Sequence, residues 1–289
     1  MSIIPQLIAN SLIAGGIYAL IALGFNLVYG ATKFFNLTHG SMAVIGGYSV
    51  YFLYKLTGVN FYLSLVLGVV ITAICGYLLN CVVFAPLRRR HASNLVLLVA
   101  SLGAFTIIQA LIAIFFTSQF QTLNHNNTQQ QIYQIGPAFI TGTQIIIIIS
   151  ALIIFIGLLL ILRYTLFGKA LKAIGDDEKV TQIIGINTNR IISQTFMLSA
   201  AIAGWAGVLI GLDTGLEPAM GMKLLLKGVI AAIVGGIGNI YGVITGAFLL
   251  GFLENFGIWK ISGEWKDAIA FILLIVFLLV RPQGIFKKK

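Results

Sequence analysis

A chain of 289 residues in which 59% are hydrophobic and only 9% are charged has too little polar surface to cover a water-soluble core of that size. Its strongly positive mean hydropathy indicates a polytopic membrane protein instead. The 18 Lys and Arg residues outnumber the 8 Asp and Glu residues, but they cluster beside apolar runs, so they predict membrane orientation and not nucleic-acid binding.

Apolar runs that could cross the bilayer follow one another with short connections. They predict an all-α polytopic integral membrane protein with about 8–9 transmembrane or re-entrant helices, in a single transmembrane domain over residues 1–289. The second, seventh and ninth runs are short or interrupted by glycine, so each is a candidate for a re-entrant or broken helix. The runs cover residues 7–30, 37–54, 61–84, 94–117, 143–162, 191–212, 222–237, 240–256 and 266–281.

Basic residues set the expected orientation, because Lys and Arg are retained on the cytoplasmic side of short loops. One cluster is Arg88 to Arg90 and another lies in and beside the segment 164–190. With both clusters inside, the N-terminus is external and the C-terminus is cytoplasmic. The 118–142 loop, which is long, polar and free of Lys and Arg, then lies outside.

The polar start of the second run supplies candidates for the translocation pathway, because buried polar groups in hydrocarbon need a partner or water. An alternative interpretation, which we favour, is that Asn36 and Thr38 cap the helix while His39 lies at the cytoplasmic interface. The candidates are Asn36, Thr38, His39 and Gly40.

The segment 164–190 contains the densest mixture of charged and apolar residues in the chain. Its pattern predicts a helical turn or two over Lys169 to Ile174, an interruption at Gly175, and a second short helix that ends at Gly185. Three acidic residues place negative charge at the start of that second helix: Asp176, Asp177 and Glu178.

Val180, Ile183 and Ile184 fall on one face of this second helix. Such an amphipathic segment can lie on lipid, or it can insert its apolar face into a groove of a cytoplasmic partner. The pattern by itself leaves both possibilities open.

The stretch from Phe167 to Ile191 is similar to the cytoplasmic coupling loop of permeases in the branched-chain amino-acid ABC importer family. Val180 stands where that family usually has Ala, and Lys172 where Arg is common. The residues that match are Gly168, Ala170, Ala173, Asp176, Gly185 and Ile186.

The resemblance extends over nearly all of the chain. Residues 16–30 resemble the first span of the family, 35–40 its N-F-A-H-G element, 235–238 its late glycine element, and 281–286 its R-P-x-G-[LI]-F ending. Several separate motifs in the same order make the resemblance specific.

The resemblance implies a transmembrane permease subunit of an ATP-binding-cassette importer in the bacterial inner membrane. The implied partners are a second similar permease, two cytoplasmic ATP-binding subunits, an external solute-binding protein and membrane lipid. The implied solutes are branched-chain or other hydrophobic amino acids, with urea, amides or nucleosides as alternatives in the same class.

The sequence contains no G-x-x-x-x-G-K-[ST] string, so we expect ATP and Mg to be used by the partner subunits. We therefore expect a transport subunit that is not an enzyme and binds no cofactor. The residues implied to couple it to the ATPase are Gly168, Ala170, Ala173, Asp176, Asp177, Glu178, Ile183, Ile184 and Gly185.

A gradient-driven secondary transporter or channel is the alternative from another class. Such proteins need intramembrane acids or unwound helices for a coupling ion, and the central runs contain almost no Asp or Glu.

We expect Glu254, near the end of an apolar run, to reach the external interface, and Lys227 to extend its side chain toward water. His39, His91 and His125 are dispersed, so no metal site is expected.

Glycines at four-residue spacing predict close approach of helices. One set is Gly238, Gly242 and Gly246. A second is Gly207, Gly211 and Gly215.

Overall fold

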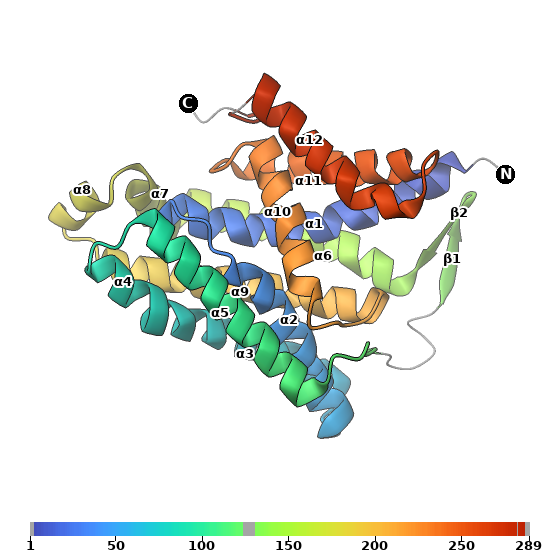
Figure 1. The fold of residues 1–289 in the computed structure, drawn as a ribbon, viewed down its shortest axis with the longest axis horizontal. Coiled ribbons are helices and arrows are strands. Elements are labelled where there is room, and N and C mark those ends of the chain that lie inside the picture. Colours follow the sequence, from blue (N-terminus) through green and yellow to red (C-terminus); the bar gives the residue numbers. More distant parts are fainter. Residues whose placement is uncertain (1–2, 124–130, 282, 287–289) are drawn as a thin grey trace.

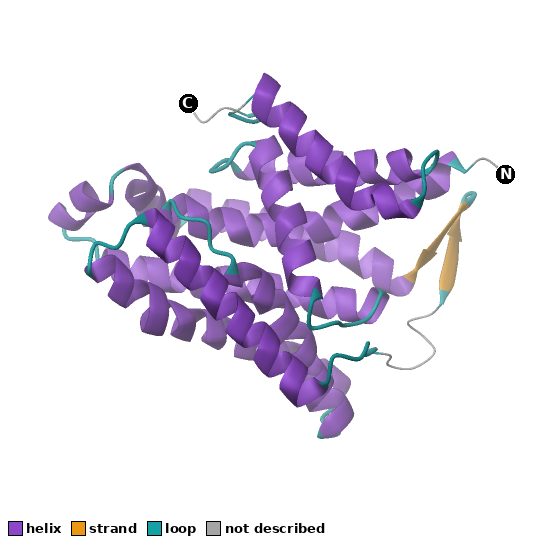
Figure 2. Cartoon of the chain, viewed as in Figure 1, coloured by secondary structure: helices purple, strands orange, loops and turns teal. Residues whose placement is uncertain are grey.

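The computed structural model describes residues 3–123, 131–281 and 283–286. His125, most of the polar stretch of the predicted external loop, Pro282 of the terminal motif and the last three lysines lie outside these described residues. Helices make up nearly all of the structure (Figures 1 and 2).

Within the described part of the chain, 6 helical segments are long and apolar enough to cross a membrane. They correspond to the first, third, fourth, fifth, sixth and eighth apolar runs. The helices are α1 (Ile4–Thr32), α3 (Phe61–Leu79, which continues to Arg89), α5 (Asn94–Phe116), α6 (Gly142–Tyr164), α9 (Thr188–Asp213) and α11 (Ile240–Ile258).

The three remaining runs form shorter helices, as their length and glycine content predict. These are α2 (Thr38–Tyr51), α10 (Met220–Gly235) and α12 (Lys266–Val280). In Figure 1, α10 crosses the direction of α1 and α9 at a steep angle, so it does not run parallel to the long helices.

Two π-helical segments interrupt the regular hydrogen bonding. One, Phe52–Leu56, extends α2, and the other, Asn80–Phe84, joins α3 to the short helix α4 (Ala85–Arg89). Pro86 lies in the first turn of α4, and because proline has no N–H, it cannot donate to the helix that precedes it.

The only strands in the described residues form a small antiparallel hairpin, β1 (Ile132–Ile135) and β2 (Ala138–Thr141). Ile132 pairs with Thr141 and Ile135 with Ala138. A short 3₁₀ turn, Gly263–Trp265, precedes α12.

The hairpin lies beside the N-terminal end of α1. The helices α4, α7 (Leu166–Asp176) and α8 (Glu178–Ile183) lie at the opposite end of the molecule (Figure 1).

Helix α1 forms the centre of the bundle. In the most apolar 18-residue stretch of α1, 83% of the residues are buried. In the corresponding stretches of α5 and α6, only 22% of the residues are buried. A helix that is apolar on every side is expected to be buried in protein or in lipid. We infer that α1 is enclosed by protein, and that the exposed apolar residues of α5 and α6, such as Ile114 and Ile153, face lipid tails.

Gly242 and Gly246 lie on α11, where an added Cβ would meet backbone atoms of Gly235 and Ala231 on α10. Gly238 differs from the predicted ladder, because it precedes α11 and has a φ of +90°. Its backbone N–H donates to Oδ1 of Asn26, 2.6 Å away. Its conformation favours glycine in a turn, so the expectation of a helical ladder was wrong for this residue.

The second predicted ladder is also incomplete. Gly207 and Gly211 lie on α9, but α9 ends at Asp213, and Gly215 follows with a φ of +101°. A backbone with positive φ cannot continue a right-handed helix. Gly215 is therefore a turn residue.

Candidate functional site

The turn between α6 and α7 is built from a capping residue and a buried glycine. The Thr165 hydroxyl accepts a hydrogen bond from the Gly168 N–H at 3.1 Å, which caps α7. A Cβ at Gly168 would collide with backbone atoms of Ile161 and Leu162. Glycine at this position therefore permits the chain to reverse closely against the end of α6.

Helix α7 packs one face against the bundle. Ala170, Leu171 and Ile174 are buried, whereas Ala173 is half-buried and Lys172 is exposed. The buried and exposed positions of α7 therefore fall on different faces of the helix. It therefore lies along the bundle and is not solvated on all sides.

The predicted interruption at Gly175 was wrong, because α7 continues through Gly175 to Asp176. A Cβ at Gly175 would approach the carbonyl oxygen of Gly30, so this glycine allows α7 to contact α1. The residue that follows the helix, Asp177, has an extended backbone (φ −153°, ψ 112°).

The Asp177 carboxylate caps α8, accepting the N–H groups of Lys179 at 2.8 Å and Val180 at 3.0 Å. Glu178 lies in the first turn of α8, where negative charge is stabilised by the helix dipole. Helix α8 ends at Ile183, and Gly185 follows with a φ of +88°, a common arrangement at a helix C-terminus.

Helix α8 is joined to α9 by side chains. Nε2 of Gln182 donates to the Thr188 hydroxyl at 3.0 Å. Oδ1 of Asn187 accepts the Arg190 N–H at 3.1 Å and caps α9. Movement of α8 can therefore be passed to the long helix α9.

We call Val180, Ile183 and Ile184 the apolar tip. Their exposed fractions are 54%, 82% and 65%, and α8 lies at one extremity of the molecule (Figure 1). Gly168 and Ala170, in contrast, are buried. Of the residues predicted to couple this segment to an ATPase, the buried ones stabilise the packing of α7 on the bundle, and those of the apolar tip are accessible to a partner protein.

The polar start of α2 is buried in the bundle. Oδ1 of Asn36 accepts the Thr38 N–H at 3.2 Å and also the Thr38 hydroxyl. The Leu37 N–H donates to the Ser101 hydroxyl of α5 at 3.1 Å. Asn36 therefore supplies a hydrogen-bond acceptor to one backbone N–H in the first turn of α2. In the same turn, a Cβ on Gly40 would meet the carbonyl of Gly221 on α10, so glycine permits the close contact of α2 with α10.

The capping interpretation placed His39 at an interface with water. This was wrong, because only 1% of His39 is exposed. Its Nε2 lies 3.0 Å from the Ile21 carbonyl and its Nδ1 lies 3.1 Å from the Ser199 hydroxyl. A carbonyl only accepts, so Nε2 carries a proton. The Ser199 hydroxyl has a single proton, for which Nδ1 and the Gly24 carbonyl, 2.9 Å from the hydroxyl oxygen, compete. His39 thereby links α1, α2 and α9.

Glu254 is also fully buried in protein, so its side chain does not reach solvent as expected. Its Oε1 lies 2.8 Å from Nζ of Lys227, and its Oε2 accepts the Tyr18 hydroxyl at 2.6 Å. Lys227 also pairs with Asp267 at 3.0 Å. Its ammonium group therefore forms ion pairs with two carboxylates, whereas we had expected it to extend toward water. The buried charges are compensated, as burial requires.

Tyr18 and Asp267 were not predicted to belong to this network. They come from α1 and α12, while Lys227 and Glu254 come from α10 and α11. Partners this far apart in the chain have no common spacing that a sequence pattern could reveal.

The sequence matches a protein family described as "Branched-chain amino acid transport system / permease component" over residues 7–278. It is 33% identical to the high-affinity branched-chain amino acid transport system permease protein BraD of Pseudomonas aeruginosa, over 97% of this chain and 94% of BraD. It is 32% identical to LivH of Escherichia coli strain K12, a permease protein of the same description, with the same coverage.

The fold resembles that of a solved structure of PsaBC from Streptococcus pneumoniae in complex with Fab. The TM-score is 0.53, and the match covers 95% of this chain and 91% of the other. Sequence identity is 15%, so this likeness concerns the fold alone.

Proposed function

This chain belongs to the family of permease components of branched-chain amino acid transport systems, and from this premise we propose that it carries branched-chain and other hydrophobic amino acids across the bacterial inner membrane. Its relatives BraD and LivH are named as high-affinity permeases for such solutes. The match over nearly the whole of both chains supports the assignment.

We propose that the chain works in a complex with a second permease, two ATP-binding subunits and an external solute-binding protein. ATP and Mg are then used by the ATP-binding subunits, and this chain supplies part of the path. The apolar tip carries this proposal, because three exposed aliphatic side chains on a capped helix and at its C-cap suit insertion into a groove of a partner protein.

The segment α7–α8 is suited to transmit movement. Closure of the ATP-binding subunits would press on the apolar tip and displace α8. The displacement would pass to α9 through Gln182 and Thr188, and to α1 through the contact of Gly175 with Gly30. A shift of α1 and α9 relative to their neighbours would exchange outward for inward access.

The experiment that tests docking replaces Ile183 and Ile184 with Glu in the complete transporter. Buried charge without a partner is costly, so we expect at least about a tenfold loss of co-purifying ATP-binding subunit and loss of solute-stimulated ATP hydrolysis. Ile132→Glu is the matched control, since it changes an exposed isoleucine (67%) of the hairpin at the opposite end of the molecule.

Normal recovery of the ATP-binding subunit with the Ile183→Glu/Ile184→Glu variant, at unchanged membrane expression, would exclude the apolar tip as the docking surface. Equal loss in the Ile132→Glu control would indicate a general defect and would also count against it.

A further inference from the structure

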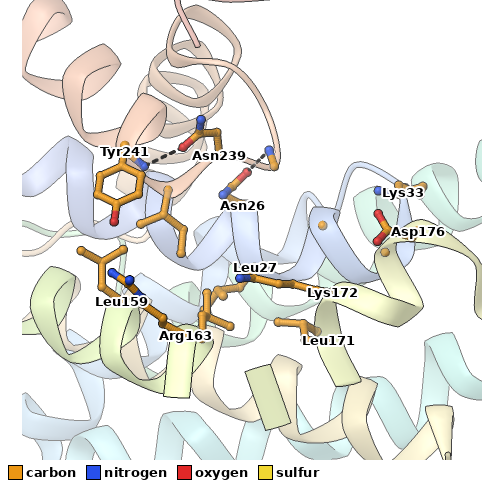
Figure 3. Close-up of a pocket in the computed structure, with 15 residues that line it drawn as sticks. Asn26, Leu27, Lys33, Leu159, Arg163, Leu171, Lys172, Asp176, Asn239 and Tyr241 are labelled. Atoms are coloured by element: carbon orange, nitrogen blue, oxygen red, sulfur yellow. Dashed lines mark hydrogen bonds between the residues drawn. The ribbon is translucent and has the colours of Figure 1, made fainter. Parts of the chain in front are cut away.

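A cavity of about 630 Å³ lies between α1, α6, α7 and the start of α11. Figure 3 shows its lining, with Asn26 and Leu27 from α1, Arg163 from α6 and Lys172 from α7. Because residues of α7 line it, the cavity lies at the end of the molecule that carries α7 and α8 in Figure 1. Its position beside the end of α6 is where a headgroup layer would meet the helices.

The polar lining of this cavity favours an anion. Lys33, Arg163 and Lys172 contribute positive charge, and Asp176 is the only acidic residue among the lining residues. Figure 3 shows Asp176 near Lys33, while Lys172 extends from α7 past Leu27 toward the side where Arg163 lies. Two cations therefore remain in excess on that side of the cavity.

Two further groups add to this preference. The N-terminus of the 19-residue helix α11 borders the cavity, and the helix dipole favours negative charge there; the Tyr241 and Gly242 N–H groups themselves donate to Oδ1 of Asn239. Asn26 is 4% exposed, and its Oδ1 is held by the Gly238 N–H. Figure 3 shows the nitrogen end of its amide turned away from Gly238, and Asn26 lines the cavity.

The remaining lining is apolar and leads to a lipid-facing surface. Leu159 and Leu162 of α6 line the cavity, and Ile153, Ile156 and Leu160 of the same helix are exposed. The rings of Phe155 and Tyr241 meet edge to face with centroids 6.2 Å apart, which joins α6 to α11 at this wall. The surface therefore suits a ligand with an anionic head and hydrocarbon tails.

We propose that this cavity binds the phosphate headgroup of an anionic phospholipid, with the acyl chains along α6. Arg163 and Lys172 contact the phosphate, and the Asn26 amide supplies a neutral donor. Basic pockets between membrane helices suit such headgroups, and guanidinium groups bind phosphate oxygens with two donors. Because Lys172 belongs to α7, the bound lipid holds α7 against α1 and α6.

The test measures lipid retained by the purified full-length chain, by native mass spectrometry after exposure to phosphatidylglycerol or phosphatidylcholine. We expect a preference of about tenfold for phosphatidylglycerol, lost in Arg163→Gln/Lys172→Gln and retained in the charge-conserving Arg163→Lys/Lys172→Arg. The matched control is Lys169→Gln/Lys179→Gln, which removes two exposed cations of α7 and α8 that do not line the cavity.

A preference that survives Arg163→Gln/Lys172→Gln, or that falls equally in the control, would overturn the proposal. A third arm adds inorganic phosphate and measures the thermal unfolding temperature. A rise as large as the one with phosphatidylglycerol would identify a free-anion site, and would overturn the lipid assignment. No rise with phosphate, together with the lipid preference, would support it.

Discussion

At the scale of single residues, several buried polar side chains connect helices that are distant in the sequence. His39 joins α2 to α1 and α9, and Glu254 joins α11 to α10 and α1. Polar groups buried in a membrane protein are costly unless they are paired. Each of these side chains has its partners within hydrogen-bonding distance, so we infer that they specify how the helices pack.

Gly24 leaves the space that the imidazole of His39 occupies, because a Cβ at Gly24 would overlap that ring. We predict that Gly24→Ala displaces His39 from the Ile21 carbonyl and lowers the free energy of unfolding by about 1–3 kcal/mol. Thermal unfolding of the purified protein in detergent measures the loss. Gly30→Ala, on the same helix, is the control, since its Cβ would meet no described atom within 4 Å; equal effects of the two changes would contradict the prediction.

The Lys227–Glu254 pair allows a second prediction. Lys227→Met removes the nearer of two cations and leaves the carboxylate of Glu254 buried with only Lys266, at 3.8 Å, beside it, so we expect a destabilisation of up to about 3–5 kcal/mol. In Lys227→Met/Glu254→Gln the amide can still accept the Tyr18 hydroxyl without a net charge, and we expect most of the stability to return. Urea-induced unfolding of the single and double variants tests this, and a double variant no more stable than the single one would refute charge compensation.

At the scale of elements, α7 and α8 form a docking segment whose shape depends on buried small residues. Gly168 permits the turn after α6 and Gly175 permits contact with α1. The Asp177 carboxylate then starts α8 in a new direction. The apolar tip is therefore held at a defined place, although its own side chains are exposed.

We predict that Gly168→Ala loosens α7, because the added methyl group would overlap backbone atoms at the end of α6. Lys169 and Lys172 lie on α7, so trypsin should cleave this segment several-fold faster once α7 detaches. Gly157→Ala in α6 is the control, since its Cβ would meet no described atom within 4 Å. Identical cleavage of the two variants and the parent protein would argue against the packing role of Gly168.

At the scale of the whole molecule, the long helices connect two unlike ends. One end carries α4, α7 and α8 with their basic residues, and the other carries the hairpin (Figure 1). The excess of Arg and Lys at the first end supports the proposal that it faces the cytoplasm.

This orientation can be measured with single cysteines introduced after Cys75 and Cys81 are replaced by Ala. We expect a membrane-impermeant thiol reagent to label Ile132→Cys in intact cells and to label Ile183→Cys only after the membrane is opened. Both side chains are largely exposed in the structure, so accessibility depends on the side of the membrane. The reverse labelling pattern would require the opposite orientation.

The sequence by itself determined the membrane class, the apolar runs, the three short segments and the position of the amphipathic α7–α8 segment. These properties follow from hydropathy and spacing along one stretch of chain, and the cost of placing each stretch in lipid depends mainly on its own composition. The family motifs were also contiguous stretches.

Only the tertiary structure decided that Glu254 is buried against Lys227, that His39 lies among three helices, and that Gly238 forms a turn. The same is true of the cavity between α1, α6, α7 and α11. A side chain near the end of an apolar run has the same sequence neighbours whether it meets water or a partner helix. Its burial and its partners are determined by helices that are distant in the chain, because only their packing brings those side chains within reach.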